Sequence, residues 1–254
     1  MKIAVVSGAS SGMGREFVKE LDKRERFDEI WVIARRRERL EELAKELRSK
    51  VRVLPLDLTN GDSVKEYEEL LKSESPEVAV LINASGYGKF GAFCDMPLDD
   101  QLGMVDLNVK SLVAMTYATL PFMKEGGRVF QIDSLSAFQP VPYIGVYGAT
   151  KAFVLSFTRA VNAEIRSRGI RMMAVCPGWV KTEFFDRAVT DDSVITYYNR
   201  FYTPDQVVKR AFHDMDKHRD VSICGAAVRN QVFLTKLLPH RLVMKIWLRQ
   251  QKKN

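Results

Sequence analysis

The chain has 254 residues, of which 46% are hydrophobic, and it carries a net charge of +7. This length suits one α/β domain with a single core, so we expect residues 1–254 to fold as one domain. No apolar run approaches the roughly 18 residues of a membrane-spanning helix, and a strand is predicted from Lys2 onward, so we expect a cytoplasmic protein without a signal peptide.

Apolar runs and helical periodicity alternate along the chain. We predict strands over 2–7, 29–34, 51–56, 78–83, 128–133, 170–176 and 221–225. We predict helices over 12–24, 37–49, 61–73, 98–123, 146–168 and 205–217. This alternation is typical of an α/β fold with a parallel sheet covered by helices on both faces.

A glycine-rich turn joins the first strand to the first helix. It contains Gly8, Ser10, Ser11, Gly12, Met13 and Gly14. A strand, a glycine turn and a helix are the context of a dinucleotide-binding fingerprint, in which backbone N–H groups and the helix N-terminus face phosphate. We predict that these residues bind a dinucleotide, with Ser10 and Arg15 as lesser candidates for phosphate contacts. A glycine turn without a ligand is the alternative.

Three arginines follow the second strand, where Ala34 precedes Arg35, Arg36 and Arg37. Sites that prefer NAD carry Asp or Glu at this strand end. The planar fork of an arginine instead suits the 2′-phosphate of NADP. We therefore predict NADP(H) as the cofactor and Arg35 as its ligand. Arg36 and Arg37 are explained equally well as the solvated start of the next helix.

Four residues are candidates for catalysis. Tyr147 and Lys151 are four apart on one helix, so the ammonium should lower the pKa of the phenol and allow proton exchange with a carbonyl or alcohol. Ser134, at the end of a strand, should donate a hydrogen bond to the same oxygen. Asn108 stands in mid-helix, which its propensity disfavours. A chance Tyr–Lys pair and a core Asn satisfied by backbone are the alternatives.

Together these motifs resemble the short-chain dehydrogenase/reductase family. The matching residues, between about residues 2 and 225, are Gly8–Gly14, Asn83-Ala84-Ser85-Gly86, Asn108, Ser134, Tyr147, Lys151 and Pro177-Gly178. The resemblance implies a doubly wound Rossmann sheet and an NADP(H)-dependent oxidoreductase. It also implies that Asn108 kinks its helix and holds a water that touches the lysine. Relatives commonly pair through the two long helices, which implies a homodimer or homotetramer.

The resemblance implies further cofactor contacts after the third, fourth and sixth strands. These residues are Asp57, Leu58, Asn83, Gly86, Pro177, Gly178, Val180 and Thr182, together with Tyr147 and Lys151. Asp57 would face the adenine, and Thr182 would bond the nicotinamide carboxamide. The chain departs from the family at Ala84, where a second Asn is usual, and at Asp133, where Ser is common.

The implied reaction is hydride transfer between nicotinamide and a carbonyl or secondary alcohol, with reduction expected to dominate and no metal required. Aromatic residues in Tyr87–Phe93 and Gly178–Thr203 favour an apolar substrate, and we interpret 178–203 as a substrate loop or lid. Core packing would explain the same aromatics. A membrane-peripheral reductase of lipid or acyl carbonyls and a non-catalytic NADP(H)-binding sensor are the alternatives.

The excess charge lies in the C-terminal extension, residues 226–254. No Asp or Glu follows Asp220, and the seven cations beyond it equal the net charge. The remainder is balanced, which argues against nucleic-acid binding. Residues 241–253 predict a basic amphipathic helix. It would rest on an anionic membrane, accept an acyl-carrier or coenzyme A phosphate, or fold over the core or a neighbouring subunit.

Cys94, Cys176 and Cys224 are widely separated in the sequence. They predict reduced thiols, mostly buried, rather than disulfides or a metal site.

Overall fold

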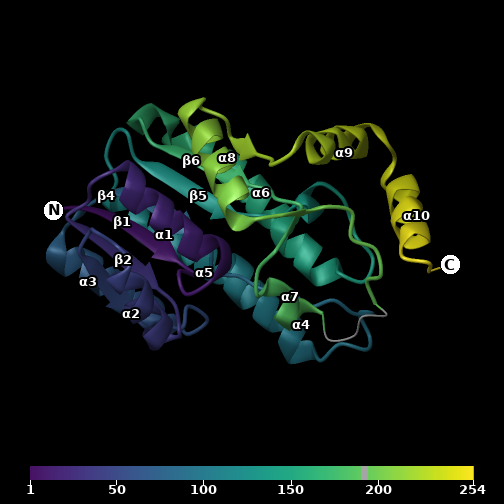
Figure 1. Cartoon of the computed structure of the whole chain (residues 1–254), viewed down its shortest axis with the longest axis horizontal. Coiled ribbons are helices and arrows are strands. Elements are labelled where there is room, and N and C mark those ends of the chain that lie inside the picture. The colour runs from purple at the N-terminus through teal and green to yellow at the C-terminus, as the bar shows by residue number, and fades with distance from the viewer. Residues whose placement is uncertain (190–193, 254) are drawn as a thin grey trace.

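The computed structural model describes residues 1–189 and 194–253, and a seven-stranded parallel sheet forms its centre. The strands are β1 (Lys2–Ser7), β2 (Glu29–Ile33), β3 (Val51–Leu54), β4 (Glu77–Asn83), β5 (Arg128–Ile132), β6 (Arg171–Val175) and β9 (Val221–Ser222). Across the sheet their order is β3-β2-β1-β4-β5-β6-β9 (Figure 1). All seven predicted strands are present, and the doubly wound Rossmann fold is confirmed.

Helices cover both faces of the sheet (Figure 1). They are α1 (Gly12–Arg24), α2 (Arg37–Lys45), α3 (Gly61–Glu74), α4 (Leu98–Val105), α5 (Ser111–Thr119), α6 (Gly145–Ile165) and α8 (Pro204–Asp216). Ala4 and Val6 belong to the core that α1, α2 and α8 cover, whereas Ile3 and Val5 belong to the core that α3, α5 and α6 cover. Successive residues of a strand point to opposite faces, so the apolar β1 supplies both cores.

The single helix predicted over 98–123 is wrong in detail, because it is interrupted. Between α4 and α5 lies a π-helical turn, η1 (Asp106–Lys110), and a 3₁₀ turn, η2 (Leu120–Phe122), follows α5. Asn108 lies in the π turn, where its amide bonds the backbone of a neighbouring loop instead of facing solvent. Pro121 lies in the 3₁₀ turn, and a proline cannot continue the α-helical hydrogen-bond ladder.

The predicted loop over 178–203 contains short elements of its own. They are β7 (Trp179–Val180), α7 (Phe184–Ala188) and β8 (Phe201–Tyr202), and β7 pairs with β8 in a separate two-stranded sheet. Rings of Trp179, Phe185, Tyr198 and Phe201 contact one another across this segment. Aromatic packing therefore gives the connection a compact shape. Residues 190–193 of the predicted loop lie outside the described residues.

Two helices close the described chain, α9 (Ala226–Leu237) and α10 (His240–Gln250). The basic helix predicted over 241–253 corresponds to α10, which ends three residues earlier. No element was predicted over α9, because its exposed Phe233 and Leu234 obscure the spacing of the buried Val228 and Val232. No helix among the described residues is long and apolar enough to cross a membrane.

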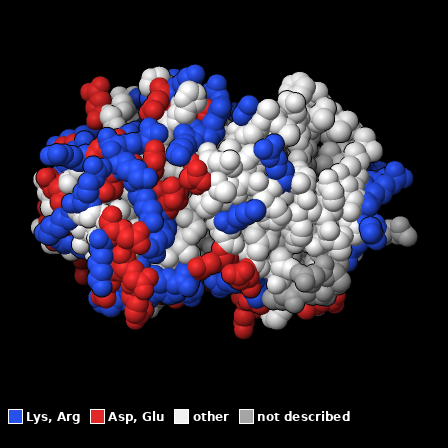
Figure 2. Space-filling view, in the orientation of Figure 1, with Lys and Arg blue, Asp and Glu red and all other residues white. Residues whose placement is uncertain are grey.

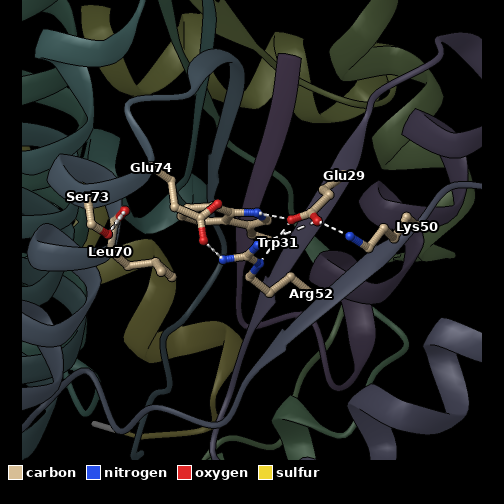
Figure 3. Close-up of polar contacts among 7 residues, drawn as sticks. All are labelled: Glu29, Trp31, Lys50, Arg52, Leu70, Ser73 and Glu74. Carbon is tan, nitrogen blue, oxygen red and sulfur yellow. Dashed lines mark hydrogen bonds and ion pairs between the residues drawn. The ribbon is translucent and has the colours of Figure 1, made fainter. Parts of the chain in front are cut away.

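A buried carboxylate ties the outer strands together at the amino ends of β2 and β3 (Figure 3). Glu29 accepts hydrogen bonds from Trp31 and Arg52, each at 2.9 Å. Glu29 also forms an ion pair with Lys50 at 2.6 Å, and Arg52 forms a second ion pair with Glu74. Burial alone would raise the pKa of Glu29, but these bonds outweigh it and hold that pKa below its ordinary value. This cluster stabilises the edge opposite the strand ends that carry the candidate site.

Candidate active site

The candidate site begins where the strand order reverses between β1 and β4, the usual place for a ligand in an open α/β sheet. Gly8 follows β1 with φ +68°, and a Cβ on it would lie 2.6 Å from the backbone of Ala84, after β4. A Cβ on Gly14 would overlap the Gly8 carbonyl. Both positions therefore require glycine, and the predicted turn lies at the reversal point.

The N-terminus of α1 is available to an anion. Ser11 is the N-cap, but its side chain makes no capping hydrogen bond, and the first turn contains no acidic residue. The first N–H groups of a helix lack partners within the helix and carry partial positive charge. With the glycine turn beside them, they suit the pyrophosphate of a dinucleotide.

Arg36, the residue after the predicted phosphate ligand Arg35, contacts this turn. Its Nη2 donates to Ser11 Oγ at 2.9 Å and to Ser10 Oγ at 3.2 Å, and its Nη1 pairs with Glu183 at 3.0 Å. Arg35 instead lies 3.7 Å from Asp57 and is largely exposed. The structure thus sets two arginines on the rim where the ribose 2′-position of a dinucleotide would lie.

Asp57 follows β3 and forms the next part of this rim. Burial opposes its charge, but hydrogen bonds from the hydroxyl and backbone of Thr59 and the nearby Arg35 keep its pKa below the ordinary value. Leu58 beside it is buried in the core. Asp57 is therefore charged at neutral pH and could accept a hydrogen bond from a ligand at this end of the sheet.

The side chain of Asn83 is buried in the core and does not face the turn after β4. Its amide nitrogen donates to Thr116 Oγ1 at 3.1 Å and to Gln131 Oε1 at 3.0 Å, inside the core. Gly86, three residues later, has no room for a side chain, because a Cβ would lie 3.0 Å from Asn108 Oδ1. At Gly86 the turn after β4 can therefore approach a ligand through its backbone.

Asn108 and Lys151 form a buried layer behind Tyr147. Asn108 accepts from the Tyr87 N–H at 3.0 Å and donates to the Tyr87 carbonyl at 2.9 Å and to Thr150 Oγ1 at 3.1 Å. Lys151 Nζ donates to the Ile132 carbonyl at 2.7 Å and lies 5.7 Å from the Tyr147 ring centre. The π turn thus holds the loop after β4 against the helix that carries the Tyr–Lys pair.

The expected lowering of the Tyr147 pKa is wrong for the protein without ligands. Burial raises the pKa of Tyr147 above its ordinary value, although a hydrogen bond with Ser134 opposes the rise. The ring packs between Phe90 and Phe184. Burial also lowers the pKa of Lys151, although the nearby Asp133 opposes this change. Tyr147 therefore keeps its proton at neutral pH.

Ser134 is oriented by a backbone contact. It caps the short 3₁₀ turn η3 (Leu135–Phe138), where its Oγ accepts the Ser136 N–H at 3.2 Å. A lone pair is used in that bond, which leaves the hydroxyl hydrogen to be donated elsewhere. Ser134 and Tyr147 both line the same cavity.

Asp133 is a buried carboxyl beside this set. Its Oδ2 accepts from Cys176 Sγ at 3.4 Å, and its Oδ1 has no partner among the described residues. Burial raises the pKa of Asp133 to about 7, although the nearby Lys151 opposes the rise. The same surroundings raise the pKa of the Cys176 thiol. An acidic group that holds a proton near neutrality thus lies directly before Ser134.

A cavity of about 480 Å³ opens from Ser134 and Tyr147 towards the C-terminal helices. Met13, Pro177, Gly178, Val180 and Thr182 line its inner part, and Val243, Ile246 and Trp247 of α10 line its outer part. Of the described residues that line it, Asp133 is the one with an acidic or basic side chain. The walls are otherwise apolar, with a few carboxamides such as Gln139, Asn230 and Gln231.

Most of the predicted site residues fall into three groups, apart from the buried Leu58 and from Asn83 and Gly86 after β4. Those that line the cavity are Met13, Ser134, Tyr147, Pro177, Gly178, Val180 and Thr182. The glycine turn, Arg35 and Asp57 lie at the ends of β1, β2 and β3, outside the cavity. Asn108 and Lys151 lie in the buried layer behind Tyr147. Trp247 was not predicted as a site residue, although its indole donates to the Pro142 carbonyl at 3.1 Å and fixes α10 at the cavity. Its place in a predicted amphipathic helix was the available signal.

Comparison with known proteins agrees with this geometry. The sequence model for short chain dehydrogenases matches residues 2–193. The chain is 35% identical over 219 residues to an NADP-dependent 3-hydroxy acid dehydrogenase of Schizosaccharomyces pombe, an alignment that covers 83% of this chain and 80% of that protein. It is 35% identical over 191 residues to sulfoacetaldehyde reductase 2 of Chromohalobacter salexigens, covering 72% and 74%.

Among solved structures, a short-chain dehydrogenase from Sphingobium yanoikuyae in complex with NADPH has a similar fold. The TM-score is 0.80 at 26% sequence identity, and the match covers 96% of this chain and 95% of that one. The similarity therefore extends through the C-terminal region that the sequence model leaves unmatched.

Proposed function

Because this chain belongs to the short-chain dehydrogenase family, we propose that it is an NADPH-dependent reductase of neutral, apolar ketones or aldehydes. The observation that carries the proposal is the cavity at Ser134 and Tyr147, whose described lining is mainly apolar and contains no cation. Residues 1–254 would act as one dinucleotide-binding and catalytic domain, with residues 178–203 as its substrate loop.

The residues present fit NADP(H). The glycine turn and the uncapped α1 N-terminus would hold the pyrophosphate, and Arg36 or Arg35 would bind the 2′-phosphate with charge-assisted hydrogen bonds. Asp57 and Leu58 would border the adenine, and Thr182 would bond the carboxamide. An NADPH-bound relative and an NADP-dependent relative support this choice.

The catalytic residues would act on the substrate oxygen. When bound, NADPH supplies the hydride that adds to the carbonyl carbon. The Ser134 hydroxyl would turn to donate to the carbonyl oxygen, and the protonated Tyr147 would donate its proton to that oxygen as negative charge develops. Lys151, which is fixed by its hydrogen bond to the Ile132 carbonyl, would stabilise the phenolate that remains. Asn108 would position the helix that carries Tyr147 and Lys151 through its bond to Thr150.

The cavity argues for a substrate unlike those in the relatives' names. A 3-hydroxy acid and sulfoacetaldehyde carry a carboxylate and a sulfonate, and a buried anion requires a cationic or metal partner. The described lining of this cavity contains no Lys, Arg or His. An uncharged ketone, or an aldehyde with an apolar chain or ring, is the class that these walls accept.

Paired substrates test this proposal. NADPH oxidation should be measured with an apolar methyl ketone and with the same skeleton bearing a terminal carboxylate. We expect kcat/KM at least about 10-fold higher for the neutral ketone, because an unpaired buried charge costs several kcal/mol. Preference for the carboxylate would contradict the assigned substrate class, even if the reductase activity stands.

A reductase of lipid or acyl carbonyls is the second candidate. It is favoured by the exposed apolar residues of α9 and α10 at the outer end of the cavity.

The family resemblance also leads us to propose a cytoplasmic homodimer or homotetramer that pairs through α5 and α6. Exposed Tyr117 and Phe153 on those helices are available for such a contact.

A further inference from the structure

The C-terminal helices carry an exposed apolar face. Phe233 and Leu237 on α9 are 62% and 65% exposed, and Leu242 and Ile246 on α10 are 43% and 42% exposed. Each pair is four residues apart, so each forms a stripe along one side of its helix. Together with Leu234 they define what we call the apolar hairpin face. It lies at the end of the molecule opposite α2 and α3 (Figure 1).

Cations accompany this face without any carboxylate. Arg241, Lys245 and Arg249 are four apart along α10, in the stripe next to Leu242 and Ile246. No Asp or Glu occurs after Asp220, and these three cations form no ion pair with a described carboxylate. Blue side chains gather on the rim at the α10 end of the molecule, beside a broad surface with few charges (Figure 2). An apolar stripe flanked by cations is the pattern of a helix that lies in a membrane interface.

The apolar hairpin face is continuous with the cavity. Leu234 and Ile246 are exposed and also line the cavity, while the neighbouring Val243 is buried in its wall. An apolar path therefore runs from the surface of α9 and α10 to Ser134 and Tyr147. An apolar molecule that left a bilayer at this face would reach the cavity without crossing water.

We propose that the apolar hairpin face docks on an anionic lipid bilayer, with its cations against the headgroups. A second copy of this chain is the less suitable occupant. In a two-fold interface the same surface meets itself, so the cations of both hairpins would be brought together with no carboxylate from either segment. Docking itself does not depend on the proposed chemistry. Delivery of an apolar carbonyl from the bilayer rests on the proposed function.

Vesicle sedimentation with the full chain tests the docking. Wild-type protein should bind vesicles of phosphatidylcholine with phosphatidylserine, and should bind phosphatidylcholine alone far more weakly. The variant R241Q/K245Q/R249Q should bind the anionic vesicles about 100-fold more weakly, since each cation near such a surface contributes about a fivefold gain. The variant F233S/L237S should also lose binding, because its apolar contact with the acyl chains is removed.

A matched pair on α4 supplies the control. Leu98 and Leu102 are also exposed and four apart, and L98S/L102S should bind the anionic vesicles like the wild type. Retained binding of NADPH by each variant reports that the fold is intact. Equal vesicle binding by F233S/L237S and wild type would overturn the proposal. The proposal would also be overturned if the wild type did not bind vesicles and F233S/L237S converted an oligomer to monomers. That result would make the apolar hairpin face a subunit interface.

Discussion

At the scale of single residues, burial favours the protonated form of Tyr147. A lysine four residues away suggests a lowered pKa, but burial among aromatic rings raises it. A tyrosine that keeps its proton is an acid, which suits carbonyl reduction. Sequence spacing identifies the pair but cannot give the pKa, because desolvation depends on what else packs on the ring.

Replacement of Tyr147 by Phe removes this acid and little else. We expect Y147F to lower kcat by about 10²–10⁴-fold, the usual contribution of a positioned acid, while NADPH affinity changes by less than about threefold. Steady-state rates and NADPH fluorescence titration measure the two effects. Tyr117→Phe on the exposed face of α5 is the control. A Y147F enzyme with near-normal kcat would remove Tyr147 from the mechanism.

Asp133 should make stability depend on pH in the opposite sense to a salt-bridged carboxylate. Its folded pKa is raised from 3.8 to about 7, so its contribution is fully present below the unfolded pKa and is lost as pH rises through about 7. Asp133→Asn stays neutral. The melting temperature of D133N relative to wild type should therefore rise between about pH 4 and pH 7 and level off above.

Thermal denaturation across this pH range measures the difference. Asp95→Asn on the surface is the control, and its melting temperature should follow the wild type throughout. Parallel curves for D133N and wild type would mean that Asp133 does not change its proton count on folding.

At the scale of elements, the turn between β2 and α2 contains the arginines that we propose select NADP(H). The sequence predicts an arginine ligand there, but the structure directs Arg36 to Ser10 and Ser11, while Arg35 lies by Asp57. Side-chain direction depends on where the strand ends, and β2 ends one residue earlier than predicted. The sequence therefore predicts an arginine at this turn, but it does not predict the contacts that each arginine makes.

Two single variants separate these arginines. Arg36→Gln should raise KM for NADPH about 10–100-fold, because it removes charge-assisted bonds to the 2′-phosphate, and should leave KM for NADH unchanged. Arg35→Gln is the matched variant and should have the smaller effect on NADPH. Initial rates with both cofactors measure the preference. A larger loss in R35Q would return the main phosphate contact to Arg35.

The strands and most helices were predictable because each has one dominant periodicity. The π turn at Asn108 was not, since it arises from the bonds between its amide and Tyr87 in a distant loop. Likewise α9 has apolar residues on both its buried and exposed sides. Local sequence patterns therefore fail to predict structure where contacts between distant residues determine it, or where apolar residues remain exposed on the surface.

At the scale of the whole molecule, charge and apolar surface are segregated. The edge at β2 and β3 is held by ion pairs such as those of Glu29 and Arg52, whereas the C-terminal end combines a mainly apolar cavity with a segment whose charged residues are all cations (Figures 2 and 3). On the proposed function, one end stabilises the sheet and the other would receive an apolar substrate. The proposed dinucleotide site lies between them, at the carboxyl ends of the strands.

The most direct test of the account follows the hydride itself. NADPH carrying deuterium at the transferable C4 position should be incubated with the enzyme and a neutral, apolar ketone, and the alcohol analysed by mass spectrometry. We expect an alcohol with one deuterium on the carbinol carbon, formed by the wild type and at least about 100-fold more slowly by Y147F. Tight NADPH binding with no labelled alcohol from any apolar carbonyl would contradict the account and favour a non-catalytic NADP(H) sensor.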